Sequence, residues 1–421
     1  MRILFISAFY PPQVVGGWEQ LVQDINHRLQ ARGHTTRVLT STHGIDTPTH
    51  EADVGRLLTL ESNIYNYQPR QFLGHKRRLK QNLEHTRQTI ERFRPDVIFI
   101  HVMWNLSRGI AWLAEQLCPG RVVYYVANDW PHAIDPHTAY WCDQAERPLL
   151  NIAKSVIAPI PLKIVAEENR TFNLKFDHVL CVSQAVKNDL GRNAGIAPEN
   201  MSVVYNGVET DLFVPPEPTP NGQTEPGALS LVYAGSLVTH KGVHTAIQAM
   251  AILAKNPELD GVTLTIIGGG HPDYEAYLKK LVIEANLTQR VKFVGRVPRE
   301  EMPALLQKFD VLIFPSIWEE PLARMTQEAM AAGLVVIGTL TGGTGELLVE
   351  NETGLTFEPE DPNKLAQQIE RLSLDPALQS TLRKNGRDTV IARFDLCRMI
   401  DEIETYLTRV IENHQNTVAS R

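Results

Sequence analysis

The sequence predicts an α/β protein with two doubly wound domains, and three observations support this. Its 421 residues exceed what one hydrophobic core usually holds. Short apolar runs rich in β-branched residues alternate with longer amphipathic segments, the pattern of parallel strands joined by helices. A stretch rich in proline, glycine and polar residues interrupts this pattern at 215–228. We therefore expect a first domain over 1–214, a linker over 215–228 and a second domain over 229–395.

Eleven apolar runs are the expected strands. Those of the first domain are Ile3–Ser7, Thr36–Thr40, Val97–Ile100, Val122–Val126, Val179–Val182 and Ser202–Val204. Those of the second are Leu231–Ala234, Thr263–Ile267, Val291–Val294, Val311–Phe314 and Val335–Ile337. In open α/β sheets ligands bind at the carboxyl ends of strands, so two such sheets facing each other would place a ligand cleft between the domains.

The C-terminal segment 396–421 predicts one amphipathic helix. Apolar residues recur at helical spacing from Leu396 through Ile400, Ile403 and Leu407. We expect this helix to cross back and pack on the first domain.

The composition excludes some classes of protein and indicates a cellular compartment. A formal charge of −7 argues against a general nucleic-acid binder. The four cysteines are scattered without metal-like spacing, which favours reduced thiols in a reducing compartment. The apolar N-terminus is closed too early, by Pro11 and Pro12, for a signal peptide, and no run is long enough to span a bilayer. We expect a cytoplasmic protein.

Two adjacent glycines follow the first expected strand and precede a helix. Gly16 and Gly17 would allow unusual backbone angles and close approach of a ligand to the helix amides. A tight turn that only packs strand on helix is the alternative.

Polar residues stand at the ends of two further strands of the first domain. Asn128, Asp129, Trp130 and His132 follow the fourth strand, where they could position a sugar hydroxyl and Trp130 could stack on a sugar ring; a helix N-cap is the alternative. His101 ends the preceding strand, where a hydrogen-bonded structural role is the competing interpretation.

In the second domain, Lys241 stands in a loop bracketed by Gly235 and Gly242, just before a helix. A fixed positive charge beside helix amides suits a diphosphate, whereas a solvent-exposed lysine is the alternative.

The segment "WEEPLARMTQEAM" (318–330) carries two acids around an expected helix start at Pro321. At 1.5 Å per residue, Glu328 would lie roughly 10 Å along the axis from Glu320, too far for a paired acid and base on one bond. An anion would suit the free amides between them, which are those of Leu322, Ala323 and Arg324. The alternative makes Glu320 an N-cap and Glu328 an exposed helix residue.

The segment from Arg70 to Arg94 contains eight Lys/Arg against two Glu, with leucines and Phe72 interspersed. It could lie on an anionic membrane at the inner face, although a solvated helix face is the competing interpretation.

Taken together, these stretches resemble glycosyltransferase family 4, whose members are retaining, nucleotide-sugar-dependent enzymes with the GT-B fold of two Rossmann-like domains. The resemblance covers nearly the whole chain in order, through "YPPQVVGGWEQLVQDINHRL", "HVLCVSQAVKNDL", "VVYNGVETDLF", "YAGSLVTHKGV", "VLIFPSIWEEP", "EAMAAGLVVIGT" and "TGGTGELLVENETGLTF".

The family's motif of two glutamates separated by seven residues falls on Glu320 and Glu328. The resemblance implies that Glu320 lies beside the donor sugar, that Glu328 binds the ribose and that Lys241 faces the diphosphate. It places Gly17 against the donor phosphate or the acceptor. Backbone groups near Arg296 and Val297 would meet the base.

The sequence departs from the family pattern at two positions. Ser236 replaces the usual arginine of the first loop, and Arg324 is a candidate to supply the missing charge. Asn128 replaces the usual histidine and cannot take up a proton, so Asp129, His101 or His132 could share its acceptor-side role.

The resemblance implies transfer of a hexose from a nucleoside diphosphate sugar to a hydroxyl of a sugar, lipid-linked or small-molecule acceptor. The chain has no D-x-D sequence, so neither a metal nor another cofactor is expected. Two other interpretations stay open: a nucleotide-sugar epimerase on the same fold, and a non-catalytic nucleotide-sugar-binding subunit.

Overall fold

A computed structural model describes residues 1–13, 16–45, 49–50, 53–64, 66–144, 148–216 and 227–419. The chain divides into two compact units. The first contains Met1–Val182, Val186–Val204 and Ile400–Arg421, and the second contains Ser183–Ala185 and Tyr205–Met399. Most of the expected linker, residues 217–226, lies outside the described residues.

The first unit is built on one eight-stranded sheet. Its strands are β1 (Arg2–Ile6), β2 (Thr35–Ser41), β3 (Thr49–His50), β4 (Val54–Leu58), β5 (Val97–Ile100), β6 (Val122–Val126), β7 (Val179–Cys181) and β8 (Met201–Val203). They lie in the order β3-β4-β2-β1-β5-β6-β7-β8, and all neighbours are parallel except β3 and β4. Because β1 lies inside the sheet and the chain winds outward on both sides of it, the predicted doubly wound topology is confirmed.

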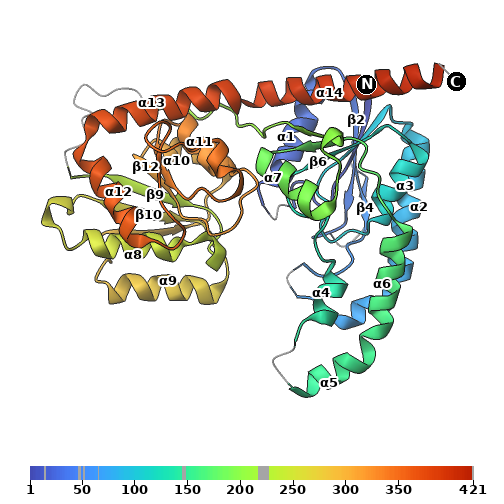
Figure 1. The fold of residues 1–421 in the computed structure, drawn as a ribbon, viewed down its shortest axis with the longest axis horizontal. Helices are drawn as coiled ribbons and strands as arrows, with labels where there is room; N and C mark the ends of the chain where they lie inside the picture. The colour runs from blue at the N-terminus through green and yellow to red at the C-terminus, as the bar shows by residue number, and fades with distance from the viewer. Residues whose placement is uncertain are drawn as a thin grey trace. The chain divides into compact units, whose positions relative to one another are not determined.

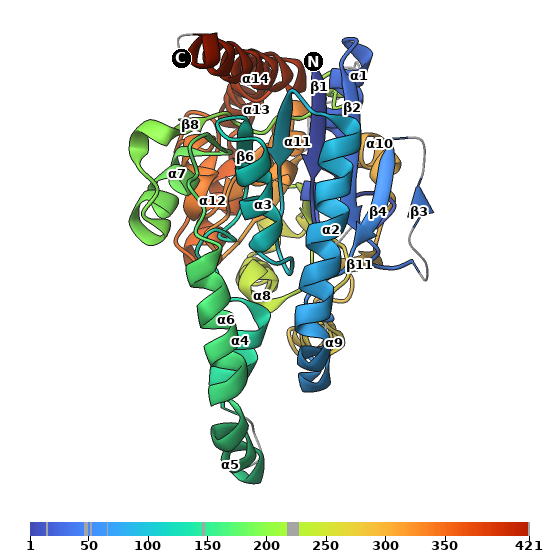
Figure 2. The same ribbon diagram turned by 90° about the vertical axis from the view of Figure 1, so that its right-hand side faces the viewer.

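Helices pack on this sheet, and some of them reach beyond it. They are α1 (Trp18–Ala31), α2 (His75–Phe93), α3 (Gly109–Leu117), α4 (Pro136–Cys142), α5 (Pro148–Ile157) and α6 (Pro159–Thr171). Helices α2 and α3 lie side by side (Figure 2). Between β6 and β7 the chain makes an excursion through α4, α5 and α6, in which α5 extends well away from the sheet (Figure 1).

The second unit has a six-stranded parallel sheet in the order β11-β10-β9-β12-β13-β14. The strands are β9 (Ser230–Ala234), β10 (Thr263–Ile267), β11 (Val291–Gly295), β12 (Val311–Phe314), β13 (Val335–Gly338) and β14 (Leu355–Thr356). The helices are α8 (Val243–Leu253), α9 (Pro272–Glu284), α10 (Met302–Leu306), α11 (Arg324–Ala331), α12 (Pro362–Leu374) and α13 (Pro376–Arg393). The short α7 (Gln184–Asp189) comes earlier in the chain and lies mostly in the first unit. Helix α8 packs against α9 and α12, and α11 packs against α13.

Residues Tyr205–Val214, which the sequence places in the first domain, lie in the second unit. They pair with the segment that precedes the last helix: the Val208 amide donates to the Phe394 carbonyl at 2.9 Å, and the Thr210 hydroxyl donates to Asp395 Oδ2 at 2.6 Å. The last helix, α14 (Leu396–Ala419), starts in the second unit and continues into the first.

Helix α14 packs on the first unit from Ile400 onward. Ile400, Ile403 and Leu407 are fully buried. On its flank, Arg32 of the first unit pairs with Asp401 and Glu404, each at 2.6 Å. In the described part of the chain no helix combines the length and apolarity needed to cross a bilayer.

Candidate functional site

The carboxyl edge of the second sheet gathers five strand-to-helix loops. The loops that follow β9, β10 and β12 touch backbone to backbone: a Cβ added at Gly242 would lie 1.9 Å from the Pro315 carbonyl oxygen, and one added at Gly268 would lie 1.8 Å from that of Gly235. Both glycines also have positive φ angles, of 66° and 137°. Only glycine fits these positions, and the candidate residues are therefore brought together on a tightly built edge.

Lys241 and Glu320 form an ion pair at this edge. The Lys241 ammonium contacts Glu320 Oε1, and the Ser316 hydroxyl donates to the same oxygen at 2.7 Å. Lys241 retains 26% of its side-chain exposure, whereas Glu320 retains 8%. A lysine that can be reached by solvent is thus held in place by a buried carboxylate, at the end of β12 and the start of α8.

Two residues that the sequence did not single out, Tyr233 and His240, lie near this pair. Tyr233 donates its hydroxyl to the Ser236 carbonyl at 2.8 Å, and burial, aided by the charge of Glu320, raises the pKa of Tyr233. Burial and then the neighbouring Lys241 charge lower the pKa of His240. The His240 carbonyl accepts from the Ile317 amide at 2.9 Å, and its ring lies 5.7 Å from that of Trp318. Tyrosine and histidine next to a loop carry no distinctive sequence signal.

The helix after Glu320 begins later than expected. Helix α11 starts at Arg324, and Ala323, its N-cap, is extended. The reason lies in the backbone before it: the Glu320 carbonyl accepts from the Gly343 amide at 2.7 Å, and Glu319 Oε2 accepts from the Gly342 amide at 2.7 Å. These bonds tie residues 319 and 320 to the loop after β13, and the helix begins only after the extended Ala323.

The amides of the first helical turn are consequently those that begin at Arg324. The amides of Leu322 and Ala323, expected within the helix, precede it, and the Leu322 side chain is buried. Glu320 lies in the loop and is therefore no N-cap. Glu328 is only 7% exposed and lies 3.8 Å from the Arg324 guanidinium, so it is no exposed helix residue either. Both alternatives that the sequence left open are wrong.

The remaining donor-side candidates occupy the same edge. Ser236 is exposed directly after β9. Arg296 and Val297 follow β11, and the Arg296 side chain lies against Gly269, where an added Cβ would come within 3.1 Å of its Nε. The loops after β10 and β11 therefore bring the Arg296 side chain against Gly269 at this edge of the sheet.

In the first unit, Gly16 and Gly17 precede α1. The Gly16 amide donates to Glu19 Oε2 at 2.9 Å, which folds the first turn of the helix back on the loop. Gly17 is the N-cap and has a right-handed φ of −79°. The unusual backbone angle expected there is therefore absent at Gly17.

The residues after β6 have different environments. Asn128 Oδ1 is buried and, among the described residues, has no hydrogen-bond partner, whereas Asp129 is exposed and its carbonyl caps a turn at His132 and Ala133. His132 pairs with Asp189 at 2.7 Å.

The two aromatic candidates, Trp130 and His101, are mainly core residues. Trp130 is 7% exposed and packs on Tyr124 and Phe176, so it presents little of its ring for a sugar to stack on. His101 is 3% exposed among the rings of Phe5, Phe99 and Tyr125, and burial lowers its pKa to about 3. His101 is therefore a neutral side chain packed in the hydrophobic core.

A cavity of about 340 Å³ opens beside the carboxyl ends of β5 and β6. Trp130 and His132 line it, together with the loop from Met103 to Arg108. Its floor carries a cluster of titratable side chains that sequence reasoning missed: Glu61, His75, His137 and Glu168.

Hydrogen bonds connect this cluster. His75 bridges Glu61 and Glu168 at 2.7 and 2.8 Å. Burial acts to lower the pKa of His75, but the two carboxylates outweigh it and raise that pKa to about 9. Burial acts to raise the pKa of Glu61, but His137, His75 and Arg78 outweigh it and lower that pKa to about 2.

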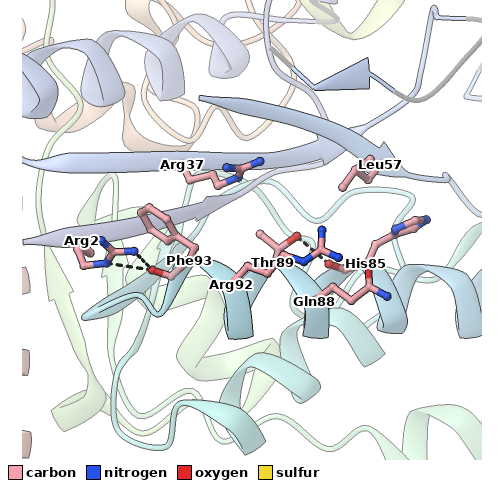
Figure 3. Close-up of a pocket in the computed structure, with 8 residues that line it drawn as sticks. All are labelled: Arg2, Arg37, Leu57, His85, Gln88, Thr89, Arg92 and Phe93. Carbon is pink, nitrogen blue, oxygen red and sulfur yellow. Dashed lines mark hydrogen bonds between the residues drawn. The ribbon is translucent and has the colours of Figure 1, made fainter. Parts of the chain in front are cut away.

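A second cavity, of about 420 Å³, lies where α2 crosses the sheet (Figure 3). Arg2, Arg37 and Arg92 line it, and the Arg2 guanidinium donates to the Phe93 carbonyl. Because Arg2 is the first residue of β1, this cavity lies toward the amino ends of the strands, away from the edge at which doubly wound sheets bind ligands.

Two family models match the chain. The model described as "Glycosyltransferase Family 4" matches residues 15–212, and the model described as "Glycosyl transferases group 1" matches residues 221–389. A protein named glycogen synthase from Mycobacterium tuberculosis (strain H37Rv) is 26% identical over 409 residues, which cover 94% of this chain and 91% of that protein.

Solved structures share the fold. Sucrose-phosphate synthase from Thermosynechococcus elongatus superposes with a TM-score of 0.69 at 24% identity and covers 100% of both chains. Anabaena HepE in complex with UDP-glucose superposes with a TM-score of 0.66 at 21% identity, over 97% of this chain and 100% of that one. The present chain thus has the GT-B fold, with one of its two sheets in each unit.

Proposed function

The chain belongs to the group 1 glycosyltransferases of family 4, and from that premise we propose that it transfers a hexose from a nucleoside diphosphate sugar to an acceptor hydroxyl, with retention at the anomeric carbon. The observation that carries this proposal is the Lys241 and Glu320 pair at the carboxyl edge of the second sheet, beside the first turn of α11. HepE has been crystallised with UDP and with UDP-glucose, which supports a nucleotide-sugar donor here as well.

In this proposal the donor lies along the loops that follow β9, β11 and β12. Lys241 and the amides that begin at Arg324 receive the diphosphate, because a fixed cation and a helix N-terminus both favour an anion. Glu320 contacts the sugar, and Glu328, held beside Arg324, binds the ribose hydroxyls. Backbone groups at Arg296 and Val297 meet the base.

The chemical step breaks the bond between the anomeric carbon and the phosphate oxygen and forms one to the acceptor oxygen. Negative charge develops on the departing diphosphate, and Lys241 stabilises it where it forms. The leaving phosphate accepts the acceptor's proton, so Asn128, which cannot take up a proton, needs only to accept or donate a hydrogen bond. In our proposal no metal or cofactor assists at the diphosphate.

The acceptor side of the proposal is the first unit. The cavity lined by Trp130 and His132 lies at a carboxyl strand edge and combines apolar with polar walls, which suits a sugar, a lipid-linked or a small-molecule acceptor. Gly16, Gly17 and Asp129 complete this side. Asn128 Oδ1, which is buried and has no hydrogen-bond partner among the described residues, is available to a hydroxyl donor.

A calorimetric titration with UDP-, GDP- and ADP-sugars tests the donor proposal and identifies the base. We expect one of the three to bind, and binding to weaken at least tenfold in Glu328→Ala, since that carboxylate meets the ribose. Lys279→Ala, an exposed lysine of α9, is the matched control and should bind like wild type. Failure of all three sugars to bind would contradict the proposal.

Product analysis separates transfer from the two other interpretations. With donor and a panel of acceptors, we expect a glycoside whose anomeric configuration, read by NMR coupling constants, matches that of the donor. An epimer or free sugar formed without acceptor would identify an epimerase. Donor binding with neither transfer nor hydrolysis across the panel would identify a binding subunit.

A further inference from the structure

We propose that the first unit binds one zinc ion between Glu61, His75 and His137. All three side chains are buried, with exposed fractions of 5%, 4% and 2%. One ligand atom from each lies within 4.8 Å of the other two. Glu61 Oε2 is 2.7 Å from His75 Nδ1 and 3.5 Å from His137 Nε2, so a nitrogen, a nitrogen and a carboxylate oxygen converge on one point.

Two atoms of this cluster make no hydrogen bond in the part of the chain that the structure describes, although His137 Nε2 does lie 3.5 Å from Glu61 Oε2. His137 Nε2 and Glu61 Oε1 are buried and make no hydrogen bond there. A buried polar atom without a partner costs free energy of about 1–3 kcal/mol, so such atoms usually have an unseen partner. Both atoms lie in the same cluster, and a cation between the three side chains would give His137 Nε2 a partner.

The outer partners match those that metal-binding histidines use. His137 Nδ1 lies 2.8 Å from the Tyr67 hydroxyl, which would leave Nε2 as the metal-facing nitrogen. His75 Nε2 lies 2.8 Å from Glu168 Oε2, which would leave Nδ1 facing the metal. A histidine that ligates zinc almost always donates its other ring N–H to a carboxylate, carbonyl or similar acceptor, and here both rings have such a partner.

The donor set favours a transition metal such as zinc over magnesium and calcium. Two imidazoles and one carboxylate suit a tetrahedral zinc ion, whereas magnesium and calcium prefer oxygen alone. With zinc–ligand distances of about 2.0–2.2 Å, tetrahedral ligand atoms lie roughly 3.3–3.6 Å apart. The 3.5 Å separation of Glu61 Oε2 and His137 Nε2 already fits, whereas the 2.7 Å separation of Glu61 Oε2 and His75 Nδ1 has to widen. The three residues also line the 340 Å³ cavity, from which a water molecule or a ligand oxygen could supply the fourth position.

The role that follows is structural. Glu61 lies in the loop after β4, His75 is the first residue of α2 and His137 lies in the first turn of α4. Glu168, the outer partner of His75, belongs to α6. One ion would therefore tie the α4–α6 excursion to α2, and with it the wall of the cavity. Because all of these residues belong to the first unit, the inference is independent of the donor site proposed above.

Metal analysis of the purified full-length protein tests the proposal. After incubation with zinc and removal of loosely bound metal by gel filtration, we expect one zinc per chain by inductively coupled plasma mass spectrometry. Cobalt substitution should give the intense visible d–d bands of tetrahedral coordination. Zinc should also raise the unfolding temperature, and a chelator should reverse that shift.

Matched variants decide whether the metal sits in this cluster. His137→Ala and Glu61→Gln should abolish retention, whereas His85→Ala, a histidine on the same helix as His75, should retain one zinc. If the ligand variants fail to fold, Tyr67→Phe removes only the oxygen at His137 Nδ1 and should weaken zinc affinity about tenfold. Tyr140→Phe, whose ring stacks on Tyr67, is its control.

Two outcomes would overturn the proposal. The first is no zinc retained and no thermal shift, in which case the cluster is a hydrogen-bonded ionic network only. The second is retention that the ligand variants leave unchanged, which would mark the metal as adventitious. Neither result would alter donor binding, so failure here and failure of the proposed transferase activity can be told apart.

Discussion

His101 shows at the scale of one residue how burial decides what a polar side chain can do. Its ring is packed among Phe5, Phe99 and Tyr125, its Nε2 has no partner in the described part of the chain, and burial lowers its pKa to about 3. A histidine at the end of a strand suggests an acceptor-side role from sequence. In the structure the same residue is a neutral member of the core.

This burial has a measurable pH dependence. In the unfolded chain His101 takes up a proton below its usual pKa near 6.5, whereas the folded protein resists protonation down to about 3. Its contribution to stability is thus present above pH 6.5 and is lost as pH falls, by roughly 1.4 kcal/mol per pH unit. His101→Phe should make the unfolding free energy fall less steeply between pH 6.5 and 4.5 in urea titrations.

The control for that experiment is His27→Phe, which removes an exposed histidine. Its stability curve should keep the wild-type slope against pH. An unchanged slope in His101→Phe would contradict the assignment of a buried, neutral imidazole.

Substitution of Lys241 or of Glu320 is expected to lower kcat. Lys241→Ala removes the cation proposed to stabilise the leaving diphosphate, and Glu320→Ala removes the carboxylate that holds it. Each should lower kcat by at least about tenfold, which corresponds to about 1.4 kcal/mol of barrier. Steady-state kinetics with the donor identified by calorimetry measure this. Wild-type rates in both variants would remove the site assignment, and Lys279→Ala should leave the rate unchanged.

Local sequence patterns singled out Lys241 and Glu320, which the structure brings together at the carboxyl edge of the second sheet, but could not identify the buried cluster of the first unit. Lys241 and Glu320 follow strands whose apolar runs are easily seen, and the family's spacing fixes Glu328. Glu61, His75 and His137 lie on separate segments without metal-like spacing, and His75 belongs to a basic run that suggests a surface helix. Only the fold brings them together.

At the scale of elements, strand prediction failed where the apolar pattern is broken. Every expected strand is present within one residue at each end, but β3, β4 and β14 were missed. In β4, Arg56 interrupts the apolar run, yet its side chain is 1% exposed. Its guanidinium donates to the Tyr10 carbonyl at 3.0 Å and to Gln13 Oε1 at 2.8 Å, which compensates for its burial. Strands β3 and β14 have two residues each, too few for any periodicity.

The start of α11 was misplaced for a related reason. Proline at the first turn favours a helix, but hydrogen bonds from the loop after β13 tie residues 319 and 320 to that loop, and the helix begins only at Arg324. Such contacts between distant segments leave no trace in a local pattern.

Helix α2 carries the membrane prediction. Lys76, Arg77 and Lys80 are exposed near its start, and Leu73 just before it is 90% exposed, whereas Arg78 is committed to the Glu61 carbonyl at 2.9 Å. We propose that this face contacts an anionic bilayer. Reversing the three exposed charges (K76E, R77E and K80E) should weaken sedimentation with phosphatidylglycerol vesicles at least tenfold at low salt.

Salt and lipid composition are the controls for α2. Binding by the wild-type protein should fall when ionic strength rises to about 0.3 M, because screening shortens the reach of surface charges. It should be weak on neutral phosphatidylcholine vesicles. Reversal of Lys279 and Lys280 on α9 should have no effect. Absence of wild-type binding to anionic vesicles at low salt would dispose of the membrane contact.

At the scale of the whole molecule, α14 contributes residues to both units. The sequence predicted a C-terminal helix on the first domain, and Ile400–Arg421 does belong to the first unit. The pattern could not show that Tyr205–Val214 belongs to the second unit, because that assignment rests on bonds to Phe394 and Asp395, far along the chain.

Substitution of Leu407 tests how much this helix contributes to the free energy of unfolding. It is fully buried, so Leu407→Ala should lower the unfolding free energy of the first unit by about 2–5 kcal/mol, through lost burial and the cavity it leaves. Urea unfolding followed by circular dichroism measures this. Asn413→Ala, at an exposed position of the same helix, should cost less than about 0.5 kcal/mol. A Leu407→Ala protein as stable as wild type would mean that α14 does not pack there.

The same helix sets the order in which the protein can mature on the ribosome. Domains usually fold as units during synthesis, the N-terminal one first. Here residues 400–419 of the first unit are translated only after the entire second unit. Until then, the surface of the first unit that Ile403 and Leu407 will cover is exposed to solvent. Completion of the first unit is therefore a late event, after α13 has left the exit tunnel, and the nascent chain has an apolar surface that a chaperone could shield until then.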